Sequence, residues 1–185
     1  MATKGAARLV DAMHRREFIR FSRRFESSEI RGYVVDVGPQ FFLLALVSDR
    51  IWFDGFECFR INDVKDLSPD PYGTFAEAAL KKRGERRLKK PSVNVGNIEA
   101  LLLSAGKAFP LVTIHREQVD PHVCWIGRVQ GVKRGRVSLL EIGPDAVWGD
   151  TPEEYRIREI TRVNFGGDYE NALHLVGGEP TSALG

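Results

Sequence analysis

The sequence predicts a mainly β fold in which two copies of one small module follow each other along the chain, each led by an α-helix. Three observations favour this fold class: short segments that alternate apolar and polar residues, an internal repeat, and a helical pattern ahead of each copy. With 185 residues, of which 43% are hydrophobic and 28% charged, the chain is long enough for two compact modules and has an ordinary globular composition.

The internal repeat carries most of this prediction. The stretch that starts at Arg31 reads RGYVVDVGPQFFLLALVSDRIWFDGFECFRINDVKDL, and the stretch that starts at Ile126 reads IGRVQGVKRGRVSLLEIGPDAVWGDTPEEYRIREITRV. Alternation alone makes any two strand-rich stretches similar, but glycines and an Arg-Ile pair at matched spacing favour a duplication. The aligned pairs include Gly32 with Gly127, Leu44 with Leu139, Phe59 with Tyr155, Arg60 with Arg156 and Ile61 with Ile157. A duplication predicts the same chain path in both halves, and one continuous core would contradict it.

Each copy is expected to hold a leading helix and five short strands. Residues 6–13 place apolar side chains on one helical face, and Asn97 is suited to cap a second helix that Gly106 closes. In the first copy, strands are expected at residues 18–25, 30–37, 41–48, 55–61 and 64–67, with counterparts in the second copy.

The domain boundaries follow from the elements between the two copies. A short trailing helix is expected at residues 74–82, and Gly84 and Pro91 interrupt any helix beyond it. The predicted modules are therefore residues 1–80 and 92–185, joined by a basic linker at residues 81–91.

The charge of the chain is unevenly distributed. The net charge is only +2, but the segment from Lys81 to Lys90 holds seven basic residues and one acid, so it carries +6 and the remainder −4. Local basicity of this kind indicates a charged partner rather than a requirement of solubility. The basic residues of this segment are Lys81, Lys82, Arg83, Arg86, Arg87, Lys89 and Lys90.

Composition and spacing argue against several classes of function. No apolar run approaches the ~20 residues that span a bilayer, and the first 24 residues lack the apolar block of a secretory signal. Cys58 and Cys124 are too few for a disulfide framework or a four-ligand zinc site, and we expect both to be buried strand residues of a reduced, cytoplasmic protein. The four histidines are scattered without metal-ligand spacing, so we expect no enzyme activity and no cofactor.

Two motifs resemble a known family. In each copy a glycine lies early in the second strand, and an aromatic–Arg–Ile segment follows the fourth strand: FRINDV from Phe59 and YRIREI from Tyr155. A helix followed by five strongly bent antiparallel strands with these motifs resembles the Sm-like (LSm) fold, which includes the bacterial Hfq-type RNA chaperones. The chain departs from the family pattern where Ile61 and Ile157 replace a glycine after the arginine. It also lacks the Asp and Asn of the turn between strands two and three, where it reads DVGPQ and VKRGR.

The resemblance implies two tandem five-stranded open barrels that bind RNA without catalysis. The nucleic-acid-binding residues are expected to be the linker residues named above, together with Lys133, Arg134, Arg136, Arg60 and Arg156. Arg60 and Arg156 have the alternative role of pairing with a nearby carboxylate, and the basic linker could be only a solvated spacer. Trp52, Phe53, Phe56 and Trp148 could stack on bases or pack internally.

Two other classes of function remain open at this point. A protein–protein scaffold could use the unpaired fourth and fifth strands, and in the family such pairing closes rings of modules. We therefore expect self-association, for example three chains that form a six-module ring. A small-ligand pocket between the two barrels is a further alternative, which the sequence neither supports nor excludes.

Overall fold

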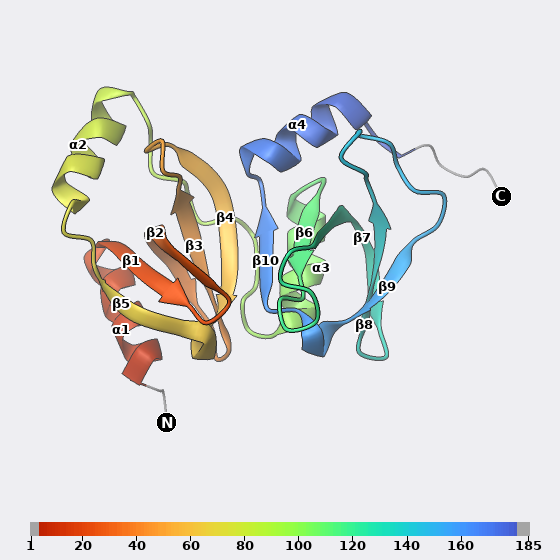
Figure 1. Cartoon of the computed structure of the whole chain (residues 1–185), viewed down its shortest axis with the longest axis horizontal. Coiled ribbons are helices and arrows are strands. Elements are labelled where there is room, and N and C mark those ends of the chain that lie inside the picture. The colour runs from red at the N-terminus through yellow and green to blue at the C-terminus, as the bar shows by residue number, and fades with distance from the viewer. Residues whose placement is uncertain (1–3, 181–185) are drawn as a thin grey trace.

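The computed structural model describes residues 4–180 and confirms a mainly β fold (Figure 1). Within these residues, four helices accompany one open antiparallel sheet of ten strands in the order β5-β1-β2-β3-β4-β10-β6-β7-β8-β9. The outermost parts of the predicted modules, residues 1–3 and 181–185, lie outside the described chain.

The first half contains α1 (Lys4–Arg15), β1 (Phe18–Arg23), β2 (Glu26–Val37), β3 (Phe41–Val47), β4 (Phe53–Arg60), β5 (Val64–Pro69) and α2 (Gly73–Lys82). The second half contains α3 (Ile98–Ala108), β6 (Val112–His115), β7 (Cys124–Lys133), β8 (Arg136–Glu141), β9 (Glu153–Arg156), β10 (Arg162–Phe165) and α4 (Asp168–Gly177). One short 3₁₀ turn lies between the last two strands of each half: η1 (Ile61–Asp63) and η2 (Ile157–Glu159).

The strands do not form two separate sheets, as the prediction of two barrels implied. β4 of the first half pairs with β10 of the second, which joins all ten strands into one sheet. We call this pairing the seam. Along the seam, Phe59, Cys58, Glu57 and Phe56 lie opposite Arg162, Val163, Asn164 and Phe165.

The aligned glycines occupy equivalent positions in the two halves. Gly32 lies opposite Leu46 of β3, and Gly127 lies opposite Glu141 of β8. A Cβ atom on Gly32 would approach the carbonyl oxygen of Ala45 to 2.2 Å, and one on Gly127 would approach that of Leu140 to 2.1 Å. Only glycine allows this close approach of the neighbouring strand, so the repeat places glycine where the backbone requires it.

The 3₁₀ turns are equivalent as well. The backbone N–H of Ile61 donates to the carbonyl of Gln40 at 2.9 Å, and that of Ile157 donates to the carbonyl of Gly135 at 3.1 Å. In both halves, therefore, the turn before the last strand is bonded to the turn between the second and third strands. Arg60 and Arg156 end the preceding strands at equivalent positions.

The hydrophobic core is divided only in part between the halves. One cluster belongs to the first half and contains residues such as Leu9, Phe21, Phe42 and Phe59. The largest cluster crosses the seam and combines residues of β3 and β4 with residues of α3, β6, β8 and β10. Within the described residues, three of the four clusters therefore lie in one half, and only the largest is shared, because α3 and the seam strands bury apolar side chains from both halves together.

The helices agree with the sequence pattern in position but not in every detail. The side chain of Asn97 caps α3, as predicted, by accepting a hydrogen bond from the N–H of Ala100 at 2.8 Å. Gly106 does not end α3, which continues to Ala108. A Cβ atom on Gly106 would lie 2.7 Å from Cβ of Val129, so this glycine allows the helix to approach β7 closely.

Candidate nucleic-acid interface

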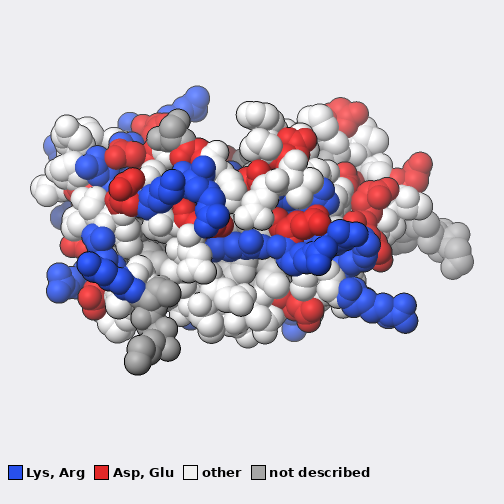
Figure 2. All heavy atoms as spheres, turned by 60° about the horizontal axis from the view of Figure 1, so that its bottom comes forward, with Lys and Arg blue, Asp and Glu red and all other residues white. Residues whose placement is uncertain are grey.

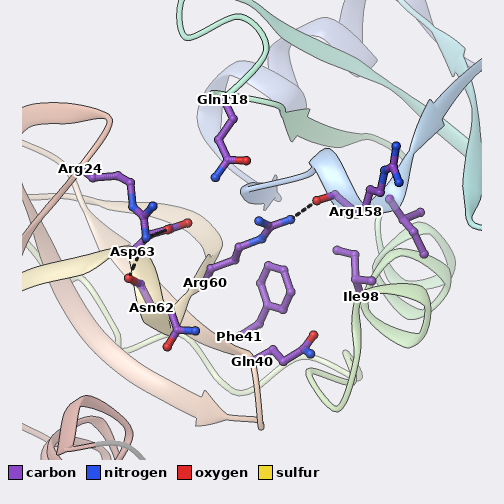
Figure 3. Close-up of a pocket in the computed structure, with 10 residues that line it drawn as sticks. Arg24, Gln40, Phe41, Arg60, Asn62, Asp63, Ile98, Gln118 and Arg158 are labelled. Carbon is purple, nitrogen blue, oxygen red and sulfur yellow. Dashed lines mark hydrogen bonds and ion pairs between the residues drawn. The ribbon is translucent and has the colours of Figure 1, made fainter.

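A cavity of about 530 Å³ opens where the two halves meet, between η1 and η2 (Figure 3). The first half contributes its 3₁₀ turn, the end of β4 and the start of β3, and the second half contributes η2 and the start of α3. The lining residues are Arg24, Gln40, Phe41, Arg60, Asn62, Asp63, Ile98, Gln118, Ile157 and Arg158. Basic and amide side chains therefore gather at the seam from segments far apart in the sequence.

Arg60 crosses this cavity from the end of β4, as Figure 3 shows. Its Nη2 donates a hydrogen bond to the carbonyl oxygen of Arg158 at 2.6 Å, which links β4 to η2. Partial burial lowers the pKa of Arg60, and the neighbouring Arg24 adds to this effect, while Asp63 opposes it. The predicted carboxylate partner of Arg60 is replaced by a backbone carbonyl of the other half.

Arg24 lies at the edge of the cavity and is held there by the first 3₁₀ turn. Its Nη2 is 2.9 Å from Oδ1 of Asp63 and also donates to the carbonyl of Asn62 at 3.2 Å. The Asp63 side chain is only 3% exposed, whereas that of Arg24 is 46% exposed. The buried carboxylate thus orients a guanidinium group whose other side faces solvent.

A basic corner lies on the second half, next to the cavity. Arg136 of β8 lies directly opposite Arg156 of β9, and like charges in that position repel each other. Each arginine has an acidic neighbour: Arg136 is 3.9 Å from Glu154, and Arg156 is 3.6 Å from Glu159. The predicted pairing of Arg156 with a carboxylate is present, and the pair of arginines remains half exposed.

The turn between β7 and β8 adds two more cations. Lys133 and Arg134 are exposed at the tip of this hairpin, where Arg134 and Gly135 both have positive φ, at 51° and 71°. Positive φ at both central residues is typical of the type I′ hairpin turn. This tight turn projects both charges away from the sheet.

Together these residues form a continuous basic strip, which we define as Lys133, Arg134, Arg136, Arg156, Arg158, Arg60 and Arg24. Figure 2 shows a band of Lys and Arg side chains along the face that is at the bottom of Figure 1. The strip runs from the β7–β8 hairpin through η2 to the cavity at the seam, and it carries five of the twelve residues expected from the sequence to bind nucleic acid.

The linker arginines form a different environment. Arg83 donates to the carbonyls of Arg50 and Ile51 and lies 4.8 Å from the Trp52 ring. Arg87 is 2.9 Å from the Glu77 carboxylate, and its guanidinium lies 4.2 Å above the Tyr33 ring. These two charges are engaged by the first half itself.

The rest of the linker is also tied to the protein. Lys90 is 2.7 Å from the Asp36 carboxylate, and Val93 and Val95, which follow it, are buried in the core that crosses the seam. Arg83, Arg87 and Lys90 therefore anchor the linker to the rest of the protein. Within the described residues, Lys81, Lys82, Arg86 and Lys89 are exposed and form no ion pair.

The aromatic residues proposed to stack on bases are mainly packed. Phe53 and Phe56 contact the core that crosses the seam. The Nε1 of Trp148 donates to the carbonyls of Gly177 and Gly178, and the Trp52 ring is covered on one face by Arg83. Packing is thus the role that the structure gives to Phe53, Phe56 and Trp148, whereas Trp52 is 42% exposed.

Several residues of the site carry no signal of their own in the sequence. Arg24, Gln40 and Asn62 come from separate turns of the first half, and the pairing of β4 with β10 brings Gln118 of the second half beside them. Arg158, by contrast, lies within the repeated YRIREI segment and could have been selected as a basic residue of that turn.

Comparison of the chain with protein-family models, with curated proteins and with solved structures found no match in any of the three searches. Between residues 4 and 180, no helix combines the length and the apolar character required to cross a bilayer. In the same part of the chain, no group of three or more His, Cys, Asp or Glu side chains is placed to hold a metal ion.

Proposed function

We propose that the chain is a non-catalytic, Sm-like RNA-binding protein whose two halves act as neighbouring modules. The order of strands supports this proposal. The first half runs β5-β1-β2-β3-β4 across the sheet, and the second half runs β10-β6-β7-β8-β9, so the fifth strand of each half lies beside its first strand. The seam joins a fourth strand to a fifth strand, which is the contact expected between neighbouring modules in the family that the motifs resemble.

The observation that carries the RNA-binding proposal is the basic strip that ends in the cavity at the seam. Cations spaced along an exposed edge can neutralise successive phosphates of a single strand, and such contacts give affinity without sequence choice. The amide side chains of Gln40, Asn62 and Gln118 add hydrogen-bond donors and acceptors beside these charges. The strip, rather than the linker, is therefore proposed to follow the RNA backbone.

Fluorescence anisotropy with a mixed-sequence single-stranded RNA at low salt tests this proposal. We expect saturable binding, which weakens steeply as salt is added. We also expect weaker binding after Arg134→Ala or Arg158→Ala and unchanged binding after Lys82→Ala, a matched control in the linker. Absence of binding at low salt would contradict the proposal, and so would an equal loss in all three variants.

Assembly into a ring is the second candidate function. The sheet ends in a fifth strand, β5, and in a fourth strand, β9, and the seam is also a pairing of a fourth with a fifth strand. Both edges carry features that oppose strand addition. Pro69 lies in β5, where Asp66 also has a positive φ of 52°, and Pro152 precedes Glu153 and Glu154 in β9. These features favour RNA binding by a chain with a single seam over the six-module ring.

Sedimentation velocity together with the ratio of absorbance at 260 and 280 nm separates the two candidates. Co-purified nucleic acid on a chain of monomeric size supports the RNA-binding proposal. A clean protein that sediments as a trimer supports the ring.

A further inference from the structure

The seam has a second face that the RNA-binding proposal does not use. Side chains alternate along paired strands, so Cys58 of β4 and Val163 of β10 point into the core that crosses the seam. Their neighbours Glu57, Arg162 and Asn164 point to the opposite face. Apart from Phe59, which packs in the core of the first half, polar side chains therefore cover the side of the seam that faces away from the shared core.

The register of the sheet extends this polar face across four strands. Arg162 of β10 lies opposite His115 of β6, which lies opposite Cys124 of β7. One row further along, Asn164 lies between Glu57 of β4 and Thr113 of β6. Residues directly opposite each other in a sheet share a face, so these six side chains form two adjacent rows. The rows follow from the backbone pairing.

A cavity of about 220 Å³ lies over these rows. The N-terminal part of α4 closes one side of the cavity with Glu170, whose Oε1 accepts a hydrogen bond from Thr113 Oγ1 at 2.5 Å. The β4 residue Asp54 closes another side, where its Oδ1 accepts a hydrogen bond from the N–H of Asp168 at 2.7 Å. The cavity is thus bounded by both halves and by a helix, on elements that are fixed to each other.

The cavity is rich in acceptors. Glu57 and Glu170 are only 8% and 9% exposed, and Oε1 of Glu57 accepts a hydrogen bond from Nδ2 of Asn164 at 2.8 Å. Burial raises the pKa of Glu57 to about 7, which Arg162 opposes, and burial lowers the pKa of His115 to about 3. His115 is therefore neutral near pH 7, when one of its ring nitrogens is an acceptor.

Three polar atoms on the cavity side chains are buried and have no partner within the described chain: Nε2 of His115, Oδ1 of Asn164 and the donor Nε of Arg162. A buried polar atom without a hydrogen bond is destabilising, so such atoms indicate a missing partner. The one cation of the lining, Arg162, lies 3.5 Å from Glu26 and 4.0 Å from Glu57. The carboxylates of Asp54 and Glu170 then leave the cavity with an excess of negative charge.

We propose that this seam cavity binds a small organic cation that carries a primary ammonium or guanidinium group. Such a group offers several N–H donors at once, which match the carboxylate oxygens and the unpartnered amide oxygen Oδ1 of Asn164. The volume of about 220 Å³ restricts the ligand to a small molecule and excludes a nucleotide.

Isothermal titration calorimetry of the full chain with agmatine, which carries both groups, is the direct test. At pH 8, above the pKa of Glu57, we expect saturable binding, with affinity at least about tenfold lower in Glu57→Gln and Glu170→Gln, because each loses one charge-assisted hydrogen bond. Both substitutions keep the carbonyl oxygen that accepts from Asn164 or Thr113. Glu99→Gln, on the exposed side of α3, removes the same charge outside the cavity and should leave affinity unchanged.

Cys124 provides an independent readout, because it lines the cavity and is exposed while Cys58 is buried. Agmatine should slow alkylation of Cys124 by iodoacetamide in the wild type but not in Glu170→Gln. The proposal is overturned if agmatine gives no saturable heat and leaves the alkylation rate unchanged. Equally tight binding of a neutral amide of the same length, or an equal loss of affinity in Glu99→Gln, would also overturn it.

Discussion

The two basic regions of this molecule have similar charge but different surroundings. In the linker, Arg83, Arg87 and Lys90 are engaged by carbonyls, carboxylates and aromatic rings of the first half, while the other four cations of the segment are exposed. In the basic strip, the hairpin residues Lys133 and Arg134 are exposed at the tip of a tight turn. The difference teaches that charge density along a sequence does not reveal whether a charge is available to a partner.

The largest expected effect is on the salt dependence of RNA binding, which should differ between variants of the two regions. Replacing Lys133, Arg134 and Arg158 by alanine should weaken binding to single-stranded RNA by about 100-fold, because three exposed phosphate contacts are lost. The slope of log K against log salt should become shallower by about 2, at roughly 0.7 per contact. The measurement is fluorescence anisotropy across a salt series.

The matched control for this variant removes the same charge from the linker, by replacing Lys81, Lys82 and Arg86 with alanine. The control should leave the slope nearly unchanged. Equal slopes in the two triple variants would show that the strip has no special role.

The next largest effect concerns the polar face of the seam and should change stability without changing RNA binding. The pKa of Glu57 is raised by burial to about 7, so folding favours its protonated form. This contribution to stability is complete below the unfolded pKa of 4.5 and is lost as pH rises through about 7. Among the charged neighbours of Glu57, Arg162 and Arg23 lower its pKa, and Glu26 and Glu170 raise it. Relative to Glu57→Gln, the wild type should lose about 2 to 3 kcal/mol of unfolding free energy over that window.

Urea unfolding of both proteins between pH 4.5 and 7.5 measures this difference. His115 acts in the opposite sense in both proteins, since its lowered pKa removes stability as pH falls below 6.5. The comparison between wild type and variant therefore isolates Glu57. A constant difference across the window would contradict the assignment.

Arg60 belongs to both the cavity and the link between the halves, so its replacement should show both kinds of effect. Arg60→Met removes the hydrogen bond to the carbonyl of Arg158, and we expect about 1 kcal/mol less stability. RNA affinity should fall by about tenfold because one cation of the strip is lost. Stability from urea unfolding and affinity from anisotropy should both change; a change in only one would assign Arg60 to a single role.

The smallest expected effect is in the linker. Arg87→Ala removes the contact with the Tyr33 ring and the ion pair with Glu77, so stability should fall by about 1 kcal/mol. RNA affinity should stay the same. Arg86→Ala, at the neighbouring exposed position, is the control and should change neither quantity in thermal or urea unfolding.

The sequence was sufficient to predict the mainly β fold, the leading helices and the equivalence of the glycines. These features depend on local spacing and on the close approach of the neighbouring strand, which requires glycine at positions 32 and 127. The seam could not be predicted, because β4 and β10 are separated by about a hundred residues. Any other unpaired strand edge could have paired with β4 or with β10. The shared core and both cavities follow from that single pairing.

The candidate site was predicted in part for the same reason. Arg60, Arg156 and the hairpin cations were found through the repeat and through local charge. Arg24 and Gln118 reach the cavity only after the halves are joined. The engagement of Arg83, Arg87 and Lys90 in the linker was not predicted, because no local pattern reveals their carbonyl, carboxylate and aromatic partners.

The most direct test of the account is ultraviolet crosslinking of single-stranded RNA to the intact chain, followed by mass spectrometry of the crosslinked peptides. We expect crosslinks in three peptides, which contain the hairpin residues Lys133–Arg136, the η2 turn and the η1 turn at the cavity between the halves. Crosslinks confined to the segment from Lys81 to Lys90 would contradict it.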